Sequence, residues 1–249
     1  MNYNKIETTS AAPKASTMVE TFRAIGYSLE TAVADIIDNS ISADARNIWI
    51  NRIWRGGRSF ITIKDDGHGM TSQEIIQAMR PGSQNPRDKR SEKDLGRFGL
   101  GLKTASFSQC RKVSVFSKRK DYAPAFWTWD LDFVAETDKW DLLRWMPEEF
   151  SNELDDVESG TLVIWSDLDR VVRPSVSELD VNAHEKFSRD LDHVKKHIAM
   201  TFHRFIEDKE IKLYWCGYGI VPWNPFCPNE NKRQLQTEDH LPGNVTVRG

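Results

Sequence analysis

The first candidate site is a pair of polar residues, Asp35 and Asn39, that lie four positions apart in the segment TAVADIIDNSISA. At helical spacing the apolar positions of this segment form one stripe, and the oxygen-bearing side chains form the opposite face. That polar face consists of Asp35, Asp38, Asn39 and Ser42. A carboxylate can draw a proton from water, and an amide oxygen one turn later can complete the coordination of a hard cation such as Mg²⁺. The same pattern is also typical of an ordinary amphipathic helix whose polar side faces water.

A second candidate site is the segment KDDGHGM, which follows a β-rich stretch at residues 59–64. Glycines at such a bend permit backbone torsions and a close approach that a Cβ atom would prevent, so a flat ring could pack against Gly67 and Gly69. An aspartate here can accept a hydrogen bond from an exocyclic amine such as adenine N6, and we predict that Asp66 does so. The alternative is a β-turn that its Asp and Gly residues merely stabilise.

A third candidate site is the glycine-rich segment GRFGLGLKT, residues 96–104, which opens a predicted helix. The backbone N–H groups at a helix N-terminus can bind phosphate oxygens, and Lys103 would add a mobile positive charge. The spacing differs from a P-loop because Leu102 separates the second glycine from the lysine, and a charged loop rather than a strand precedes the segment. The order of the glycines also differs from the dinucleotide-binding fingerprint.

The elements that must position these residues alternate between helical and extended patterns. A long polar loop, RPGSQNPRDKRSEKDLGRFG, separates the second candidate site from the third, and loops of that length are typical of active-site lids or disordered segments. We expect helices at 17–24, 29–42, 71–79 and 191–206 and a further one beginning near 103, strands at 47–54, 59–64, 112–117, 125–131 and 161–165, and a hairpin within 211–226.

Length and composition describe an ordinary globular chain. Its 249 residues are enough for one sizeable domain, and its net charge of −3 gives no global field that would attract nucleic acid or an anionic membrane. The three cysteines form neither a CxxC pair nor a zinc-binding spacing, and the N-terminal segment lacks the apolar core of a secretory signal. No apolar run is long enough to span a membrane. We therefore expect a cytoplasmic protein that does not bind membranes.

Four segments in order, AxADIIDNSxxA, DDGHGM, GRFGLGLKTAS and SGTLVIW, resemble the four motifs of the GHKL ATPases, which include gyrase B, the Hsp90 chaperones, histidine kinases and MutL. The sequence most resembles MORC-like bacterial ATP-binding proteins. This resemblance implies an α/β two-layer sandwich of the Bergerat, or Hsp90-like, type, with a mixed, mostly antiparallel sheet and helices on one face. It covers residues 17–226, after a flexible N-terminal lead at 1–16. Residues 227–249 would be a linker and the beginning of a second, truncated domain.

The resemblance also implies a role for each matching residue. Asp35 would be the catalytic base or water-orienting group, and Asn39 would bind Mg²⁺. Residues 80–98 would form the ATP lid, which orders around bound nucleotide. The residues expected to contact ATP are Asn39, Asp66, Gly67, Gly69 and Met70 from the first two motifs, Gly99, Leu100, Gly101, Leu102 and Lys103 from the third, and Thr161 from the fourth.

Two departures from the family pattern affect the predicted activity. Asp35 stands where the family usually has Glu, and one methylene less withdraws the carboxylate by about 1.5 Å, enough to slow a reaction that depends on exact positioning. Ser42 stands where many relatives have Asp. We therefore predict Mg²⁺-dependent ATP binding with slow hydrolysis, and nucleotide-driven lid closure and homodimerisation of the full-length protein. The alternative is a nucleotide-gated binding module that does not hydrolyse ATP.

Two further patterns have a simpler interpretation. His193 and His197 lie one helical turn apart, but no third metal ligand follows at a sequence spacing typical of a metal site. A solvated helix face is therefore the better explanation. The basic run RKVSVFSKRK could contact DNA phosphates, yet such runs are usually solvated strand edges.

Overall fold

The protein is organised around a seven-stranded sheet with the strand order β4-β3-β5-β2-β1-β6-β7. The structure is a computed structural model that describes residues 7, 9–82, 101–226, 238–241 and 245–248. All neighbouring strands in this sheet pair antiparallel except β1 and β6, which are parallel. The predicted mixed, mostly antiparallel sheet is confirmed. Its strands are β1 (Asn47–Ile53), β2 (Phe60–Asp65), β3 (Lys112–Lys118), β4 (Ala125–Asp130), β5 (Gly160–Ser166), β6 (Lys212–Trp215) and β7 (Tyr218–Gly219).

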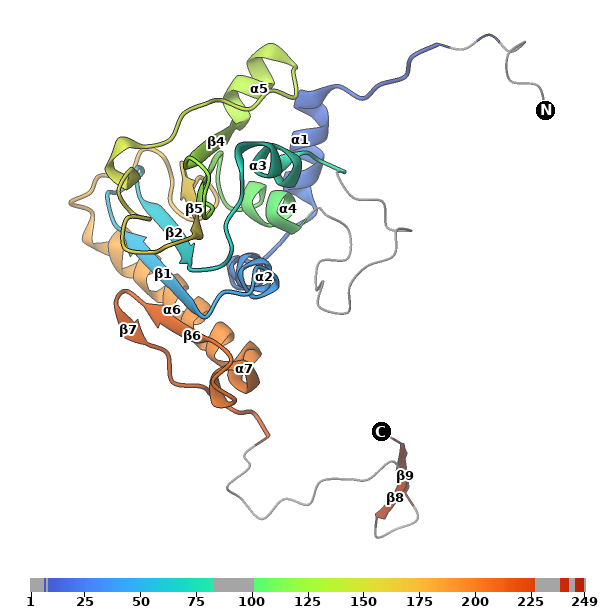
Figure 1. The fold of residues 1–249 in the computed structure, drawn as a ribbon, viewed down its shortest axis with the longest axis vertical. Helices are drawn as coiled ribbons and strands as arrows, with labels where there is room; N and C mark the ends of the chain where they lie inside the picture. Colours follow the sequence, from blue (N-terminus) through green and yellow to red (C-terminus); the bar gives the residue numbers. More distant parts are fainter. Residues whose placement is uncertain (1–6, 8, 83–100, 227–237, 242–244, 249) are drawn as a thin grey trace.

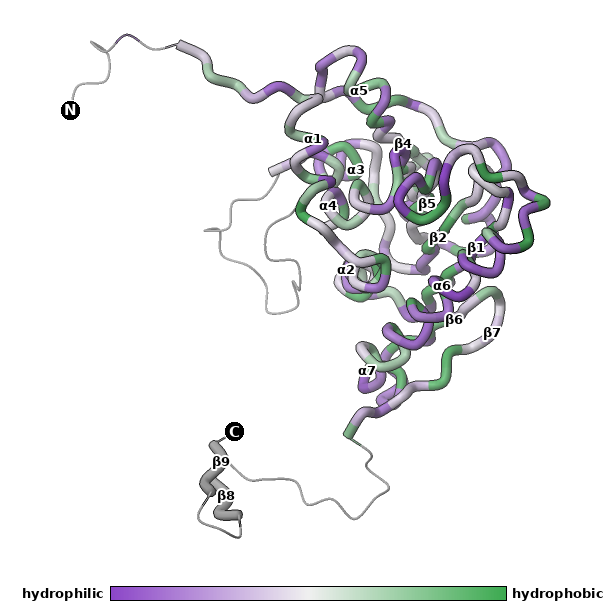
Figure 2. The backbone as a smooth tube through the Cα atoms, turned by 180° about the vertical axis from the view of Figure 1, so that it is seen from behind, coloured by the Kyte–Doolittle hydropathy of each residue, from purple (hydrophilic) through white to green (hydrophobic). Residues whose placement is uncertain are grey.

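Helices cover one face of the sheet, as expected (Figure 1). Because side chains alternate along a strand, one set of alternate residues from each central strand faces the helices and joins the main hydrophobic core. In β2 this set is Ile61 and Ile63, both at most 1 % exposed. Figure 2 shows hydrophobic and hydrophilic residues interspersed along the chain. The helices are α1 (Ala15–Ala24), α2 (Leu29–Ser42), α3 (Ser72–Met79), α4 (Gly101–Phe107), α5 (Leu131–Thr137), α6 (Val181–Thr201) and α7 (His203–Glu207).

The opposite face of the sheet is partly covered by a segment without long helices, which includes the short 3₁₀ helix η2 (Glu148–Phe150). Phe150 and Leu154 from this segment pack on Phe116, Leu162 and Ile164 of the sheet and form a second, smaller hydrophobic core. The acidic side chains of residues 132–159 are exposed. The apolar residues of the same segment divide, since Val134 joins the main core while Trp140 and Trp145 remain partly exposed.

The helices that carry the candidate sites begin at side-chain caps. Ser28 accepts a hydrogen bond from the backbone N–H of Thr31 at the start of α2. Thr71 and Glu74 form a reciprocal capping box at the start of α3. One helix prediction needs correction: the expected helix at 191–206 is two helices, α6 and α7, that meet at Phe202, and α6 begins ten residues earlier than expected, at Val181. The start at Val181 was missed although Asp180 caps it through the N–H of Ala183.

Several predictions fall outside the described residues or stay untested. Residues 83–98 of the expected lid, together with Gly99 and Leu100, lie outside the described part of the chain. Near the C-terminus, β8 (Glu238–Leu241) and β9 (Val245–Arg248) pair as a separate two-stranded sheet. The division into a lead, an ATP-binding domain and a linker stays a prediction. Among the described residues, no helix combines the length and hydrophobicity that crossing a membrane requires.

Candidate functional site

Helix α2 places three oxygen-bearing side chains together, as its sequence predicts. Asp35 and Asp38 are half-buried, whereas Asn39 is exposed. The Asp35 carboxylate lies beside the start of α4, where a Cβ atom added to Gly101 would come within 3.4 Å of Asp35 Oδ2. Burial raises the pKa of Asp35, and burial together with the charge of Asp35 raises the pKa of Asp38 to about 6. The polar face of α2 therefore carries two carboxyl groups that are costly to ionise together.

Asp65, the last residue of β2, is the most enclosed acid near this helix. Its carboxylate accepts hydrogen bonds from the Ser40 hydroxyl of α2 at 2.9 Å, the Gly67 N–H at 2.9 Å and the Thr161 N–H at 3.2 Å. Only 5 % of the residue is exposed. Burial raises the pKa of Asp65, and these three hydrogen bonds oppose the shift. An ionised carboxylate has about four acceptor positions, so three donors leave room for one more.

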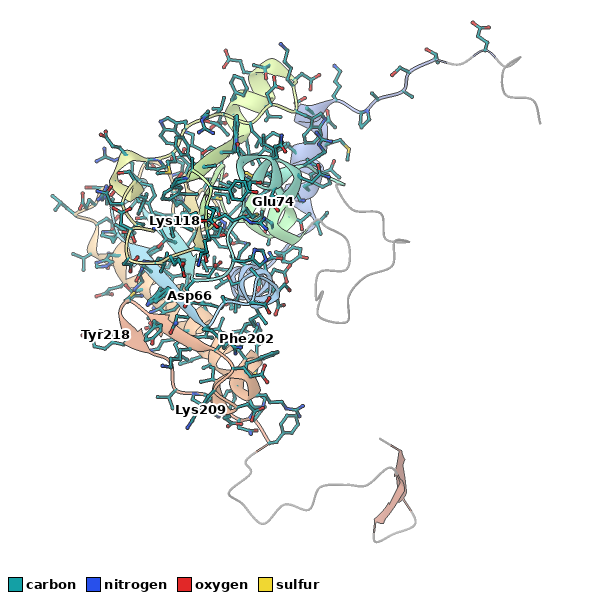
Figure 3. All side chains as sticks on the ribbon, in the orientation of Figure 1. Asp66, Glu74, Lys118, Phe202, Lys209 and Tyr218 are labelled. Atoms are coloured by element: carbon teal, nitrogen blue, oxygen red, sulfur yellow. The ribbon has the colours of Figure 1, made fainter. Side chains whose placement is uncertain are left out.

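Asp66, the residue predicted to accept the adenine amine, has its carboxylate engaged by other parts of the protein. Its carboxylate accepts hydrogen bonds from the backbone N–H groups of Arg46 and Asn47, both at 2.7 Å, and from the Asn47 side chain at 2.6 Å. Because successive side chains of a strand point to opposite faces, Asp65 follows Ile61 and Ile63 toward the helices. Asp66, labelled in Figure 3, comes after the end of β2, and its bonds to Arg46 and Asn47 tie this end to the start of β1. The geometry therefore favours Asp65 over Asp66 for contact with a ligand beside α2.

The turn after Asp65 requires glycine at two positions. A Cβ atom on Gly67 would lie 2.7 Å from the carbonyl oxygen of Ala43, the residue that follows α2. Gly69 has a φ of +67°, and its Cβ would lie 2.0 Å from the Lys118 carbonyl oxygen. The glycines thus let this turn pack closely against α2 on one side and β3 on the other. Met70 follows, and its N–H donates to the Ser117 hydroxyl at 2.8 Å.

Thr161 lies opposite Asp65 in the pairing of β5 with β2. Its hydroxyl is 2.9 Å from the Ser117 hydroxyl, and the Ser117 hydroxyl also donates to the Gly160 carbonyl. A network of hydrogen bonds therefore runs from α2 through the end of β2 to β5 and β3. Thr161 is brought to the same place as Asp65, Gly67 and Met70, so these residues form one group, which we call the β2 turn cluster.

The third motif is described only from Gly101 onward. Leu102 is half-buried against the main core, and Lys103 is 3 % exposed. The Lys103 ammonium donates to the carbonyl oxygens of Ala78 at 2.8 Å and Arg80 at 3.1 Å, at the C-terminal end of α3. Burial lowers the pKa of Lys103 to about 8. In this conformation the ammonium is held by α3, so contact with a phosphate would require it to leave these two carbonyl groups.

The oxygen donors on α2 suit Mg²⁺ better than a transition metal. The described residues contain no group of three or more His, Cys, Asp or Glu side chains arranged to hold a metal ion. Mg²⁺ is commonly held by one or two protein oxygens together with substrate phosphates and water. The exposed amide of Asn39, one turn from Asp35, provides such a donor set.

The basic run at 111–120 is largely neutralised within the protein. Arg111 pairs with Asp132 at 2.6 Å, Lys112 with Asp167 at 3.0 Å and Lys120 with Glu158 at 2.7 Å, and Arg119 pairs with Glu74. The Lys118 ammonium donates to the carbonyl groups of Leu154 and Val157. These contacts weigh against a DNA-binding surface. The expectation of a solvated strand edge is wrong, however, because β3 lies between β4 and β5 and its five central residues are buried.

Comparison with known proteins identifies the family. Residues 27–161, more than half of the chain, match the protein-family model described as histidine kinase-, DNA gyrase B-, and HSP90-like ATPase. The chain belongs to this ATPase family. The resemblance inferred from the four motifs is therefore confirmed, and family membership supports ATP binding and possible hydrolysis.

Individual relatives agree with this assignment. The chain is 30% identical to ATPase morc-1 of Caenorhabditis elegans over 89 residues, which cover 36% of this chain and 10% of that protein. It is 31% identical to the DNA mismatch repair protein MutL of Dictyoglomus turgidum over 114 residues, which cover 44% of this chain and 19% of that protein. It is also 33% identical to Protein MICRORCHIDIA 6 of Arabidopsis thaliana over 92 residues, 35% of this chain and 13% of that protein. The matches thus span under a fifth of these relatives.

A solved structure supports the fold. The ATPase and transducer domains of DNA topoisomerase II from Balamuthia mandrillaris superpose with a TM-score of 0.50 and 16% sequence identity. The superposition covers 79% of this chain and 48% of that one. The α/β sandwich expected from the sequence is therefore confirmed as the fold of this ATPase family.

Proposed function

We propose that this protein binds ATP with its adenine at the β2 turn cluster and its phosphates beside Asp35 and Asn39, and that it hydrolyses the nucleotide slowly. The observation that carries this proposal is the buried carboxylate of Asp65. It is bonded to Ser40, the residue that follows Asn39 on α2, so one helix links the two ends of the nucleotide. Asp65 retains acceptor capacity for the exocyclic amine of adenine. Asp65 takes the role that the sequence analysis gave to Asp66.

The phosphate end would use the polar face of α2. Asn39 would hold Mg²⁺ through its amide oxygen, and the bound ion would neutralise phosphate charge. Asp35 would accept a proton from, or orient, the attacking water, since its carboxylate lies between α2 and the start of α4. Gly101, Leu102 and Lys103 would face the phosphates, together with Gly99 and Leu100 from outside the described residues. Lys103 would exchange the carbonyl groups of Ala78 and Arg80 for a phosphate.

Two observations favour a second candidate, a module that binds ATP without cleaving it. Asp35 is shorter than the Glu usual in the family, and Lys103 is engaged with α3. The family resemblance also motivates lid closure over residues 80–98, homodimerisation of the full-length protein and a cytoplasmic location. These three features are proposals.

Calorimetric titration with a non-hydrolysable ATP analogue, with and without Mg²⁺, tests the binding site. The chain offers a matched pair of variants, Asp65→Asn and Asp66→Asn, at adjacent positions. An asparagine at 65 can still accept from Gly67 and Thr161, while its NH₂ group would face the adenine amine. We expect Asp65→Asn to weaken binding by about 100-fold, the effect of leaving a buried polar group unpaired, and Asp66→Asn to bind like the wild type.

Two other results would contradict this assignment. If Asp66→Asn abolished binding and Asp65→Asn did not, the adenine would lie on the other side of the strand. If the wild type bound no analogue in the presence of Mg²⁺, the proposed function would fail. Thermal unfolding of both variants provides the control for folding.

A further inference from the structure

We propose that Ser117 determines base specificity: it makes the site prefer a purine with an amino group at position 6 over a purine with an oxygen there. It acts by fixing the direction of one hydrogen bond, the bond between its own hydroxyl and that of Thr161. This inference rests on the proposed function and deepens it, because it concerns which base the β2 turn cluster accepts. Ser117 lies on β3, outside the four motifs from which the candidate residues were predicted.

Three polar residues form a row across the sheet. Thr161 of β5 is paired with Asp65 of β2 on one side and with Ser117 of β3 on the other. Directly opposite residues of antiparallel strands share a face, and here it is the face on which Asp65 meets Ser40 of α2. Gly160 permits the close approach of β5 to β2, since a Cβ atom on it would lie 2.1 Å from the Asp65 carbonyl oxygen. Backbone pairing therefore sets the positions of all three side chains.

The hydroxyl of Ser117 has three neighbours, and two of them can act in only one way. The Met70 N–H, at 2.8 Å, can only donate to it. The Gly160 carbonyl, at 2.9 Å, can only accept, so it takes the single proton of the Ser117 hydroxyl. The third contact, with the Thr161 hydroxyl at 2.9 Å, must therefore use the proton of Thr161. Ser117 is 0 % exposed, and its one donor and two acceptor positions are all filled.

The Thr161 hydroxyl is consequently an acceptor toward a ligand. Its proton is directed to Ser117, and only lone pairs remain on its oxygen. The neighbouring Asp65 also offers an acceptor: its Oδ1 takes the N–H groups of Gly67 and Thr161, while its Oδ2 takes the Ser40 hydroxyl and has room for one more donor. A base that contacts both side chains must therefore bring hydrogen-bond donors.

This requirement distinguishes between purines. The amino group at position 6 of adenine brings two N–H donors, whereas hypoxanthine and guanine have at that position an oxygen with lone pairs only. A site built on hydrogen bonds to one substrate group strongly rejects an analogue that cannot make them. Without Ser117, the Thr161 hydroxyl would be free to rotate and donate to the oxygen of an oxo purine. Ser117 therefore prevents the site from adapting to the wrong base.

The test compares calorimetric binding, with Mg²⁺, of the non-hydrolysable ATP analogue and of its inosine counterpart, which carries hypoxanthine. The wild type should bind the adenine compound about 100-fold more tightly. Ser117→Ala should reduce this ratio by about tenfold, the effect of one hydrogen bond, chiefly by binding the inosine compound more tightly. Ser114→Ala is the matched control and should keep the wild-type ratio. It removes an equally buried hydroxyl from the same strand, one that is bonded to Thr128 at 2.6 Å.

The ratio separates specificity from a general loss of structure. Ser117→Ala removes a partner from Met70 and from Gly160, and a resulting loss of affinity common to both nucleotides leaves the ratio unchanged. In a Thr161→Val background the hydroxyl that Ser117 directs is absent, so adding Ser117→Ala should not change the ratio further. Thermal unfolding checks each variant. If Ser117→Ala does not fold, Ser117→Cys replaces it, because a thiol fills similar space but accepts weakly and should also lower the ratio.

The outcomes distinguish this inference from the proposed function. If the folded Ser117 variant keeps the wild-type ratio, or if the wild type binds both compounds equally, the inference is overturned and ATP binding stands. If Ser114→Ala lowers the ratio as much as Ser117→Ala does, the effect belongs to the packing of β3 and the inference is again overturned. If the wild type binds neither compound, the inference and the proposed function both fail.

Discussion

The two ends of the candidate site differ in how completely the protein builds them. At the β2 turn cluster, hydrogen bonds among α2, β2, β3 and β5 fix the carboxylate of Asp65 and the hydroxyl groups of Thr161 and Ser117. Near the phosphate end, Asn39 is exposed and the Lys103 ammonium is held by α3. The first end is pre-organised by the sheet, whereas under the proposed function the second would have to rearrange in order to contact phosphates.

This difference has a physical origin. The β2 turn cluster lies at the ends of central strands, where the backbone hydrogen bonds between paired strands fix the positions of its residues. The proposed phosphate end would depend on side chains of two helices and on Gly99 and Leu100, which lie outside the described part of the chain. We expect variants of the first end to change nucleotide affinity and stability, and variants of the second to change turnover and the pH dependence of binding.

The largest effect on turnover should come from Asp35→Asn. The amide keeps the size of the side chain but cannot accept a proton, so single-turnover cleavage should fall by about 100-fold or more while analogue binding changes little. Asp35→Glu is the matched control and should retain cleavage, since it restores the longer carboxylate. Equal phosphate release from wild type and Asp35→Asn would exclude Asp35 as the base.

An effect of intermediate size should be the pH dependence of analogue affinity that titration of Lys103 causes. Its pKa is lowered to about 8, so in the free protein the ammonium loses its proton above that pH. Binding to phosphate requires the charged form, and affinity for the analogue should therefore fall by up to about tenfold per pH unit above the pKa. Calorimetry in buffers of different ionisation enthalpy would detect the proton taken up.

The Lys103→Arg variant sharpens this prediction. A guanidinium stays charged throughout this range, so its affinity should vary less with pH than that of the wild type. If both proteins show the same dependence, the titrating group is the nucleotide or another side chain, and Lys103 does not contact phosphate.

The smallest effect should be that of Ser40→Ala on stability. The variant removes one of three donors to the buried Asp65 carboxylate and should lower the free energy of unfolding by about 1–2 kcal/mol at neutral pH. Burial raises the pKa of Asp65 in the folded state, and loss of a donor raises it further. A raised folded pKa favours the folded state below the unfolded pKa, and this advantage disappears as the pH rises through the folded value.

The stability difference should therefore be largest near neutral pH and shrink in acid. Chemical denaturation of the wild type and Ser40→Ala at both conditions measures it, with Ser42→Ala as the control at an exposed position of the same helix. A difference that is equal at both pH values would show that Ser40 acts through packing rather than through Asp65.

Much of this site could be predicted locally. The helical period and the cap at Ser28 predict α2 to the residue, and they place Asp35 and Asn39 on one face. The glycines of DDGHGM predict the turn that follows β2. The sequence analysis chose Asp66 for the adenine amine, whereas the alternation of Ile61, Ile63 and Asp65 along β2 favours Asp65. This alternation can be used only if the residue at which the strand ends is known, and strand ends are the least certain part of a sequence-based assignment.

The sequence by itself determined the order of the motifs, the helices and strands that carry them, and hence the family and its sheet. These follow from periodicity, caps and turns, which act over a few residues. Only the tertiary structure decided which aspartate faces α2, that Lys103 binds the end of α3, and that Thr161 meets Asp65. Each of these contacts joins side chains from different elements, and no local pattern specifies which of several polar neighbours a side chain will reach when those elements pack.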